Sequence, residues 1–377
     1  MKDELTNRRE FLGTLALGAG AAVCPRVFGA VSPKCNYGAL LHLGSNMWGD
    51  FSEDPGQYAQ SAEEEKIRPN PVNPGGKSKV SYHSYLQCRD DLWKELVDRA
   101  AERGLNQIFI DLGEGVEYPS HPELKVPGTW SVEKLRKELA RMRGLGLEPI
   151  PKLNFSTCHD AWLKEYHRMV STKTYYQVVA DVIRDVCEVF DRPRYFHLGF
   201  DEETPAAVKN RAMAVIRQGD LWWHDFNYCV REVERNGARA MLWSDMICAG
   251  KETFLKRMSK DVVQMPWYYG TDFSEKNVTW DASFEKKTDW SVQRNLAASI
   301  GVLCDAGYDV IPCTSNWSNA KASESMVAYC RDRVPVRRLK GFLTAPWFMT
   351  LACQRQKLEE GIRLFADAKR KLYPAKA

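Results

Sequence analysis

Short apolar runs alternate with helical patterns along most of the chain. The helical patterns place apolar residues three or four positions apart, which keeps them on one face of a helix. This alternation is typical of a parallel sheet whose strands are joined by crossover helices. The runs expected to form strands are residues 39–43, 107–112, 148–153, 195–200, 239–243, 262–266, 309–313 and 341–345.

The helical patterns between these runs carry signals for helix ends. Ser131 stands where an N-cap is expected, directly before an apolar stripe. Several strands are preceded by a glycine of the kind that ends a helix, at positions 104, 146, 237 and 307. The stripes comprise Leu92, Leu96 and Ala100; Leu135, Leu139 and Met142; Val179, Ile183, Val186 and Phe190; and Leu358, Ile362 and Phe365. Eight strand–helix units over residues 31–377 predict one α/β domain, a (β/α)8 TIM barrel, in preference to an open doubly wound sheet.

Two segments fall outside the repeating units. Arg8 and Arg9 precede a Gly- and Ala-rich apolar stretch, which predicts a twin-arginine export signal over residues 1–30. The mature chain is therefore expected in the periplasm or outside the cell, with no stable membrane association, because the apolar stretch is too short for a comfortable span. Residues 51–79 are polar and rich in Pro and Gly, and they predict a long surface loop that either covers a site or lacks fixed structure.

Composition and charge argue against several classes of function. The formal net charge is +4, with 53 basic and 49 acidic residues interspersed, so no nucleic-acid partner is expected. The 11 cysteines contain no C-x-x-C pair, which argues against a zinc ribbon. No G-x-G-x-x-G follows a predicted strand, so a dinucleotide site is not expected either. The favoured interpretation therefore includes no cofactor and no metal ion.

The fourth apolar run ends in three consecutive carboxylates, Asp201, Glu202 and Glu203. Carboxylates this close shift one another's pKa values, which suits proton chemistry. The same acids could instead cap a helix that starts near Thr204 and Pro205. Because active sites of such barrels lie where the strands end, we take these acids as the centre of the candidate site.

Aromatic and polar residues follow the other predicted strands. A ring of Trp and Tyr side chains offers flat apolar faces with polar edges, which match a sugar ring, so a carbohydrate is the expected partner. The aromatic residues could instead simply close the top of the barrel, and His197 could be a buried strand residue. The candidate substrate-binding residues are Trp48, His159, His197, Trp243, Asp245, Trp267, Asn316, Trp317 and Trp347.

Two motifs resemble a known family. The pattern His197-x-Gly199-x-Asp201-Glu202 resembles the fourth-strand signature of glycoside hydrolase family 20, the β-N-acetylhexosaminidases. Residues 146–159, which read GLEPIPKLNFSTCH, resemble the third strand of that family and the turn that follows it. The resemblance covers roughly residues 130–350. It implies a divergent catalytic barrel of this family.

The resemblance also implies roles for individual residues. Glu202 would be the general acid and base, and Asp201 would hold the acetamido group of the substrate, whose carbonyl oxygen attacks the anomeric carbon. Tyr268 or Tyr269 would stabilise the developing oxazolinium. The residues themselves favour such substrate assistance, because predicted strands six, seven and eight end without the second carboxylate that a retaining enzyme with its own nucleophile needs.

Other interpretations stay open from the sequence. Asp245 also follows a strand and could be a nucleophile or an inverting base, depending on its distance from Glu202. Glu114, His159, Glu203 and Asp245 could together hold Mg²⁺ or Mn²⁺ in a metal-dependent sugar isomerase or epimerase. A barrel that binds carbohydrate without catalysis is a third alternative.

Overall fold

The computed structural model describes residues 35–51, 59, 61–67, 82–208, 211, 213–285 and 293–373. The expected export signal lies outside the described residues, as does most of the expected loop at 51–79, of which α1 (Ala62–Ile67) is described. No helix in these ranges is long and apolar enough to cross a membrane.

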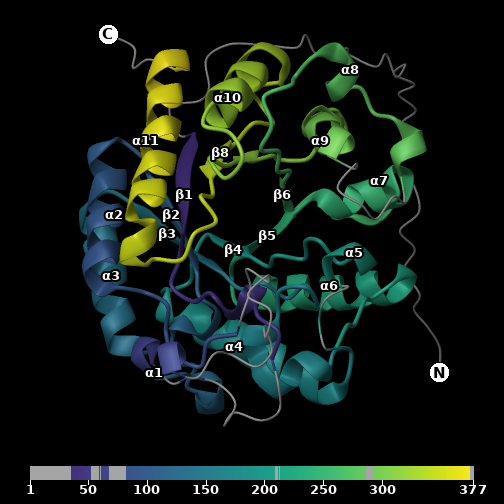
Figure 1. Ribbon diagram of the computed structural model, residues 1–377. Helices are drawn as coiled ribbons and strands as arrows, with labels where there is room; N and C mark the ends of the chain where they lie inside the picture. The colour runs from purple at the N-terminus through teal and green to yellow at the C-terminus, as the bar shows by residue number, and fades with distance from the viewer. Residues whose placement is uncertain are drawn as a thin grey trace, which may run out of the picture.

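The described chain forms an eight-stranded parallel sheet surrounded by helices, as Figure 1 shows. The strands are β1 (Asn36–His42), β2 (Gln107–Asp111), β3 (Glu148–Lys152), β4 (Tyr195–His197), β5 (Arg239–Trp243), β6 (Val263–Met265), β7 (Cys313–Thr314) and β8 (Gly341–Thr344). Their order in the sheet is β6-β5-β4-β3-β2-β1-β8-β7, and parallel bridges from Gln264 to Val310 and from Trp267 to Cys313 join β6 to the β7 segment. The predicted (β/α)8 barrel is therefore confirmed.

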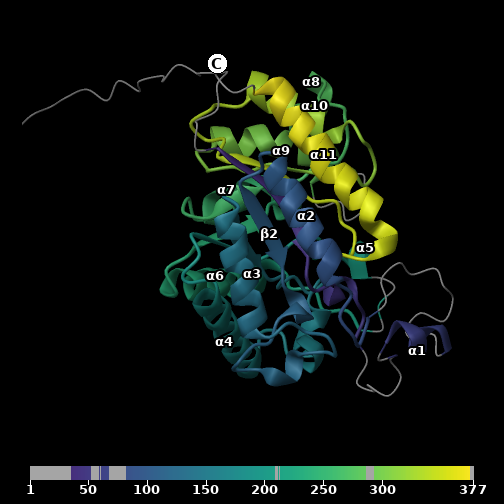
Figure 2. The same cartoon turned by 90° about the vertical axis from the view of Figure 1, so that its left-hand side faces the viewer.

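The helices pack around the sheet and against one another. Figures 1 and 2 show α11 beside α2 and α10, so the end of the described chain covers the start of the barrel. The α-helices are α2 (Asp90–Glu102), α3 (Val132–Gly144), α4 (Lys173–Val189), α5 (Pro205–Val208), α6 (Gly219–Arg235), α7 (Lys251–Arg257), α8 (Glu275–Val278), α9 (Gln293–Asp305), α10 (Ala322–Arg333) and α11 (Arg355–Leu372). Short 3-10 helices are η1 (Asn46–Trp48), η3 (Gly113–Gly115), η4 (Pro122–Leu124), η5 (Ala161–Arg168), η6 (Asp245–Ala249), η7 (Ala282–Phe284) and η9 (Ala352–Gln354).

The predicted helix boundaries agree with the structure. Ser131 caps α3, and its hydroxyl accepts a hydrogen bond from the Lys134 amide. The glycines at 104, 146, 237 and 307 all have positive φ, between 78° and 91°, which lets the chain leave a helix and enter the next strand.

Two strands differ from the prediction for local reasons. The seventh was expected at residues 309–313, but the regular strand is Cys313–Thr314, and Val310 makes isolated bridges to both neighbouring segments. Pro312 has no N–H to donate to a ladder, and this interrupts the pairing. The fourth was expected to reach Phe200 but ends at His197, because Gly199 and Phe200 have φ values of 73° and 65°.

Buried charged and titratable residues join the first three strands. The Lys152 ammonium donates to Asp111 at 2.6 Å, and His42 Nδ1 lies 3.4 Å from the same carboxylate. These side chains are at most 1% exposed. Buried charges are tolerated when they are paired in this way. The contacts of Asp111 with Lys152 and His42 thus hold the ends of the first three strands together.

Candidate active site

The segment after β4 is held in an uncommon backbone conformation. Gly199, Phe200 and Glu202 all have positive φ, of 73°, 65° and 57°. A side chain at position 199 would also meet Asn154, since a Cβ built there lies 2.0 Å from its Oδ1. A non-glycine residue in this region costs roughly 1–3 kcal/mol and persists only where its surroundings fix it.

Hydrogen bonds to two other segments fix this backbone. The Glu202 amide donates to Asp245 Oδ2 at 2.9 Å. The Ser156 hydroxyl donates to the Asp201 carbonyl at 2.5 Å, and the Cys158 thiol donates to the Glu202 carbonyl at 2.7 Å. The ends of β3 and β5 therefore determine how the two acids at the end of β4 are presented.

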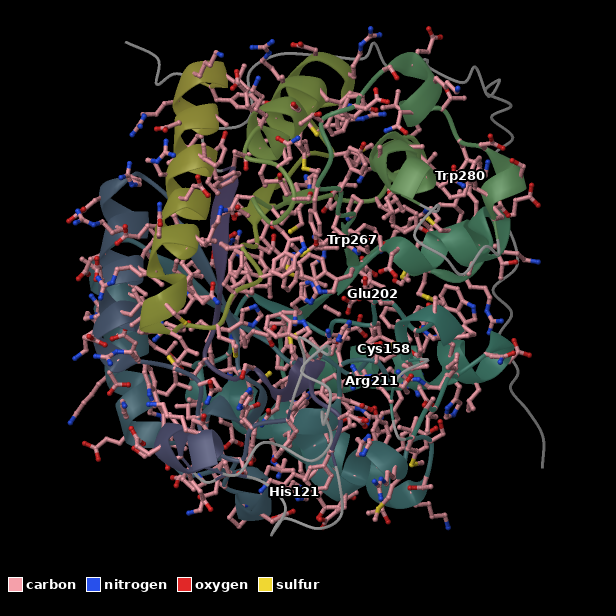
Figure 3. All side chains as sticks on the ribbon, in the orientation of Figure 1. His121, Cys158, Glu202, Arg211, Trp267 and Trp280 are labelled. Carbon is pink, nitrogen blue, oxygen red and sulfur yellow. The ribbon has the colours of Figure 1, made fainter. Side chains whose placement is uncertain are left out.

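The two carboxyl groups have different surroundings. Asp201 accepts a hydrogen bond from the Asn154 amide at 2.8 Å, and its side chain is 10% exposed. The Glu202 side chain is 23% exposed, and its Oε2 lies 3.2 Å from His159 Nε2. Asp201 is thus a fixed acceptor, whereas Glu202 is open to an incoming group. Figure 3 shows Glu202 inside the ring of helices, between Trp267 and Cys158.

His159 connects both acids to η1, the segment that follows the first strand. Its Nδ1 lies 3.3 Å from the Met47 carbonyl, and its Nε2 lies 3.2 Å from Glu202 and 3.5 Å from Asp201. A carbonyl can only accept, so Nδ1 carries a proton, and Nε2 then shares a second proton with a carboxyl group. Burial disfavours the charged imidazole, but the charges of Asp201 and Glu202 outweigh it and raise the pKa of His159. This arrangement keeps a proton next to Glu202.

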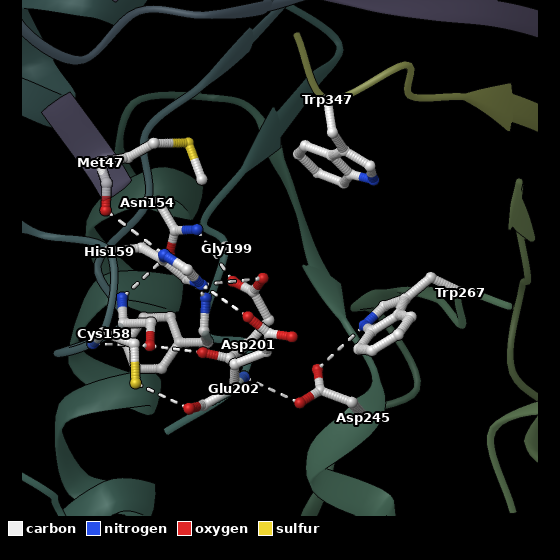
Figure 4. A network of polar contacts seen from close by, with 12 residues as sticks. Met47, Asn154, Cys158, His159, Gly199, Asp201, Glu202, Asp245, Trp267 and Trp347 are labelled. Atoms are coloured by element: carbon white, nitrogen blue, oxygen red, sulfur yellow. Dashed lines mark hydrogen bonds and ion pairs between the residues drawn. The ribbon is translucent and has the colours of Figure 1, made fainter. Parts of the chain in front are cut away.

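Asp245 is a third carboxyl beside this pair, as Figure 4 shows. Besides the Glu202 amide, it faces the Trp267 indole N–H at 3.4 Å. Burial and the charges of Asp201 and Glu202 raise the pKa of Asp245 well above its usual value. A carboxyl that tends to hold its proton is a poor nucleophile, and the hydrogen bond from the Glu202 amide makes Asp245 a support for that backbone.

Aromatic side chains line the opposite side of the site. Figure 4 shows Trp267 and Trp347 across from Asp201 and Glu202, with Asp245 beside Trp267. The Trp347 indole donates to the Tyr269 hydroxyl at 2.8 Å, and the Tyr269 ring stacks on Trp267 at 5.2 Å. Burial raises the pKa of Tyr269 well above its usual value, so its hydroxyl keeps a hydrogen to donate. Trp243 is fully buried, and its ring centroid lies 5.7 Å from that of Trp347. The ring centroid of Trp48 lies 6.4 Å from that of Trp347.

Several predicted site residues lie elsewhere. Tyr268 is turned away, since its hydroxyl donates to the Asp272 carbonyl at 3.4 Å and its ring contacts Phe273. Asn316 donates to the Lys357 carbonyl of α11 at 3.0 Å. His197 is fully buried, and its Nδ1 accepts from the Gly199 amide at 3.0 Å. Burial keeps its pKa well below 6.5, so it is a neutral support for the turn after β4. Trp317 is at the rim, 48% exposed.

The four residues proposed as metal ligands are not brought together. Glu203 is buried and accepts from the Arg217 guanidinium at 2.8 and 3.0 Å, so it anchors the loop after β4. Glu114 is buried against the amides of Ser45 and Asn46. Within the described ranges, the one cluster able to hold a cation is His159, Asp201 and Glu202, whose ligand atoms lie within 4.8 Å of one another.

Three contributors to the site are not among the predicted catalytic and substrate-binding residues. Asn154 follows β3 by two residues, so its place at a strand end was a usable signal. Met47 contributes a main-chain carbonyl and Cys158 a thiol that donates to a carbonyl, and neither contact leaves a trace in the residue pattern.

Comparison with known proteins gives matches among solved structures. No family model matches, and no curated protein matches. The β-N-acetylhexosaminidase from Bacteroides fragilis matches with a TM-score of 0.53 at 16% identity, over 89% of this chain and 66% of that one. An inactive mutant of the family 20 exo-β-N-acetylglucosaminidase from Vibrio harveyi matches with a TM-score of 0.52 at 15% identity, over 90% and 58%. Dispersin B matches with a TM-score of 0.51 at 13% identity, over 76% of this chain and 95% of that one.

At these identities the similarity concerns the fold. The chain spans about 58–66% of the length of the first two of these proteins, so it does not account for the whole of either. The chain therefore shares the barrel fold of the family 20 β-N-acetylhexosaminidases, as the motif around Asp201 and Glu202 predicts.

Proposed function

We propose that this chain is a glycoside hydrolase that removes a terminal 2-acetamido sugar by substrate-assisted retaining catalysis. The observation that carries the proposal is the pair of adjacent carboxyls with unequal surroundings, Asp201 fixed by Asn154 and Glu202 open beside His159. The names of the similar structures support the same substrate class.

The proposed reaction has two displacements. Glu202 gives its proton to the glycosidic oxygen while the acetamido carbonyl oxygen of the substrate attacks the anomeric carbon, which releases the leaving group and forms an oxazolinium. Asp201 accepts the acetamido N–H and so stabilises the positive charge. Glu202 then takes a proton from the water whose oxygen attacks the anomeric carbon and opens the oxazolinium with net retention, and His159 stays hydrogen-bonded to Glu202 through both steps.

The placement of the remaining carboxyls supports assistance by the substrate. Asp245 accepts from the protein and holds a proton readily, so it is ill suited to attack a sugar. Strands β6, β7 and β8 are followed by aromatic and amide side chains in the described residues 266–270, 315–317 and 345–348. A retaining enzyme with its own nucleophile needs a second carboxylate about 5 Å from the acid.

The aromatic side of the site supports sugar binding. Trp267 and Trp347 present flat faces opposite the acids, and a pyranose ring stacks well on such faces. The Tyr269 hydroxyl is positioned by Trp347 and could donate to the acetamido carbonyl oxygen as its charge changes.

A pair of aryl glycosides that differ only in the 2-substituent tests this proposal. We expect release of the aryl group from the 2-acetamido β-glycoside and at least 100-fold less from the 2-hydroxy analogue, because the latter lacks the internal nucleophile. A thiazoline analogue of the oxazolinium should inhibit competitively. Equal cleavage of both glycosides together with trapping by a 2-fluoro sugar would refute substrate assistance, and binding without turnover would favour the non-catalytic alternative.

A second candidate function follows from the cluster of His159, Asp201 and Glu202, which could hold a divalent cation in a sugar isomerase. The two candidates give opposite results with a chelator. Loss of activity on dialysis against EDTA and recovery with Mn²⁺ would favour the isomerase, whereas the hydrolase should keep full activity.

We also propose that residues 1–30 direct export by the twin-arginine route. The support is the Arg8-Arg9 pair and the apolar stretch that follows it. Fusion of these residues to a reporter that is active only after export should give a signal, and replacement of both arginines by lysine should abolish it.

A further inference from the structure

Glu114 holds the start of η1, the segment that reaches His159 through Met47. Its side chain is fully buried. One carboxylate oxygen accepts from the Ser45 amide at 2.8 Å, and the other accepts from the Asn46 amide at 3.1 Å. A buried carboxylate is costly unless such donors satisfy it, so this contact fixes the path of the chain after β1.

The segment held by Glu114 is rigidly mounted. Gly44 and Gly115 allow the ends of β1 and β2 to touch, because a Cβ at Gly44 would lie 2.3 Å from the Leu112 carbonyl oxygen and one at Gly115 would lie 2.6 Å from Leu43. On the other side, the Asn46 side chain donates to the His83 carbonyl at 2.6 Å and accepts from the His83 amide at 2.8 Å.

Met47, the residue after Asn46, contacts His159 through its main-chain carbonyl. The Met47 carbonyl lies 3.3 Å from His159 Nδ1, and His159 Nε2 lies 3.2 Å from Glu202. The chain of contacts therefore runs from Glu114 through the backbone of η1 to the imidazole, and from the imidazole to Glu202. In Figure 4 the Met47 carbonyl points at His159 from the side opposite the carboxyl groups.

We propose that Glu114 is a positioning residue for the candidate acid Glu202. It holds the amides of Ser45 and Asn46, and thereby keeps the Met47 carbonyl where it fixes the tautomer and orientation of His159. The proposal rests on the function proposed above, but the state of the imidazole can be measured without substrate.

The charged and titratable groups around Glu114 come from three segments. Asp111 of β2 and Tyr118 after η3 lie near it, as does Lys164 of η5. Burial and the charge of Asp111 raise the pKa of Glu114 to about 7, whereas the amides of Ser45 and Asn46 oppose that rise. The hydrogen bonds from the amides of Ser45 and Asn46 to Glu114 are therefore strongest above neutral pH, when the carboxylate is ionised.

Glu114→Gln is the informative variant because it changes one atom in place. The glutamine side chain keeps one oxygen that accepts from the Ser45 main-chain N–H. Its NH2 group lies beside the Asn46 main-chain N–H, so two donors face each other. Glu138→Gln is the matched control, since Glu138 is also a buried glutamate and its partners are Trp93 and Arg141 of the outer helices. If the glutamine variant fails to fold, Glu114→Asp takes its place in the test. The aspartate keeps the negative charge, but its side chain is one methylene shorter and holds the amides of Ser45 and Asn46 less well.

The test follows the imidazole signals of His159 by NMR with labelled histidine in the full chain, together with kcat and KM for an aryl 2-acetamido glycoside over a range of pH. The chain has seven histidines, and the absence of one signal in His159→Gln assigns the peak. We expect Glu114→Gln to shift the pKa or the tautomer of His159 and to lower kcat about tenfold with KM within twofold. Glu138→Gln should change neither.

Unchanged His159 signals in the folded Glu114→Gln variant would overturn the proposal, as would a kcat equal to that of the wild type. If the wild type hydrolyses no glycoside, the proposed function fails, and the imidazole signals alone decide whether Glu114 positions His159.

Discussion

The two sides of the barrel mouth are built from different chemistry. After β3, β4 and β5 the chain places Asn154, His159, Asp201, Glu202 and Asp245, which are linked by hydrogen bonds and ion pairs. After β6 the rings of Trp267 and Tyr269 stack on each other, and the Trp347 indole after β8 donates to the Tyr269 hydroxyl. One half of the mouth is suited to moving protons and the other to holding a flat apolar face.

The difference shows how the site can separate catalysis from binding. On the polar side small displacements matter, because proton transfer depends on distances near 3 Å. On the aromatic side the contact is spread over a surface, and each ring contributes a part of the affinity. Substitutions on the polar side should therefore lower kcat, whereas those on the aromatic side should mainly raise KM.

The largest expected effect is that of Glu202→Gln. The amide cannot give a proton to the glycosidic oxygen, so kcat for an aryl 2-acetamido glycoside with a poor leaving group should fall about 10³-fold. The loss should shrink for a leaving group of low pKa, which needs less protonation. The check is steady-state kinetics on two aryl glycosides that differ in leaving-group pKa, and an unchanged kcat would mean that Glu202 is not the acid.

A smaller effect concerns stability on the polar side. Asp160 is buried next to His159, and burial raises its pKa to about 7, since the opposing charges of Arg217 and Arg211 do not compensate. A folded-state pKa above the unfolded value gives stability that is present at low pH and lost as pH rises through about 7. Asp160→Asn removes this pH dependence. Between pH 4 and pH 8 the free energy of unfolding of the variant should therefore rise relative to that of the wild type by up to about 4 kcal/mol.

Denaturant unfolding of both proteins at each pH measures this difference. The comparison between wild type and variant matters because His42, His167 and His197 have lowered pKa values and contribute the opposite slope to both proteins. If the difference in free energy of unfolding between the two proteins does not change from pH 4 to pH 8, the Asp160 carboxyl ionises normally.

The sequence predicted most of the barrel because its signals were local. Apolar runs marked the strands, and the four named stripes correspond to α2, α3, α4 and α11. The short seventh strand was predicted less well, because Val310, Pro312 and Cys313 combine a strand composition with a missing donor.

The parts of the site that the sequence left open depend on contacts between distant segments. Consecutive residues of an extended chain point to opposite sides, so either Tyr268 or Tyr269 could face the site, and it is Tyr269 that contacts Trp347. Glu203 was ambiguous because its partner Arg217 lies in an irregular segment without a periodic pattern. The Met47 carbonyl is a main-chain group that any residue would supply.

On the aromatic side, Trp347→Ala should raise KM more than it lowers kcat. It removes one stacking face and the N–H that holds the Tyr269 hydroxyl. Loss of about 1–2 kcal/mol of buried apolar contact corresponds to a rise in KM of roughly 10-fold. Trp347→Phe keeps a ring but loses the N–H, so comparison of the two variants in steady-state kinetics separates stacking from the support of Tyr269. A fall in kcat without a change in KM would contradict the division of the mouth into two sides.

The smallest expected effect is that of Trp317→Ala at the rim. Trp317 is 48% exposed, and its ring lies 5.1 Å from Phe348, which directly follows Trp347. A substrate with a second sugar ring could cover this exposed surface, whereas an aryl monosaccharide is too short to do so. We expect KM to rise about threefold for a chain substrate and to stay unchanged for the aryl glycoside, since half an indole face is worth under about 1 kcal/mol. Equal effects on both substrates would place Trp317 at the first sugar and extend the aromatic side of the mouth as far as the rim.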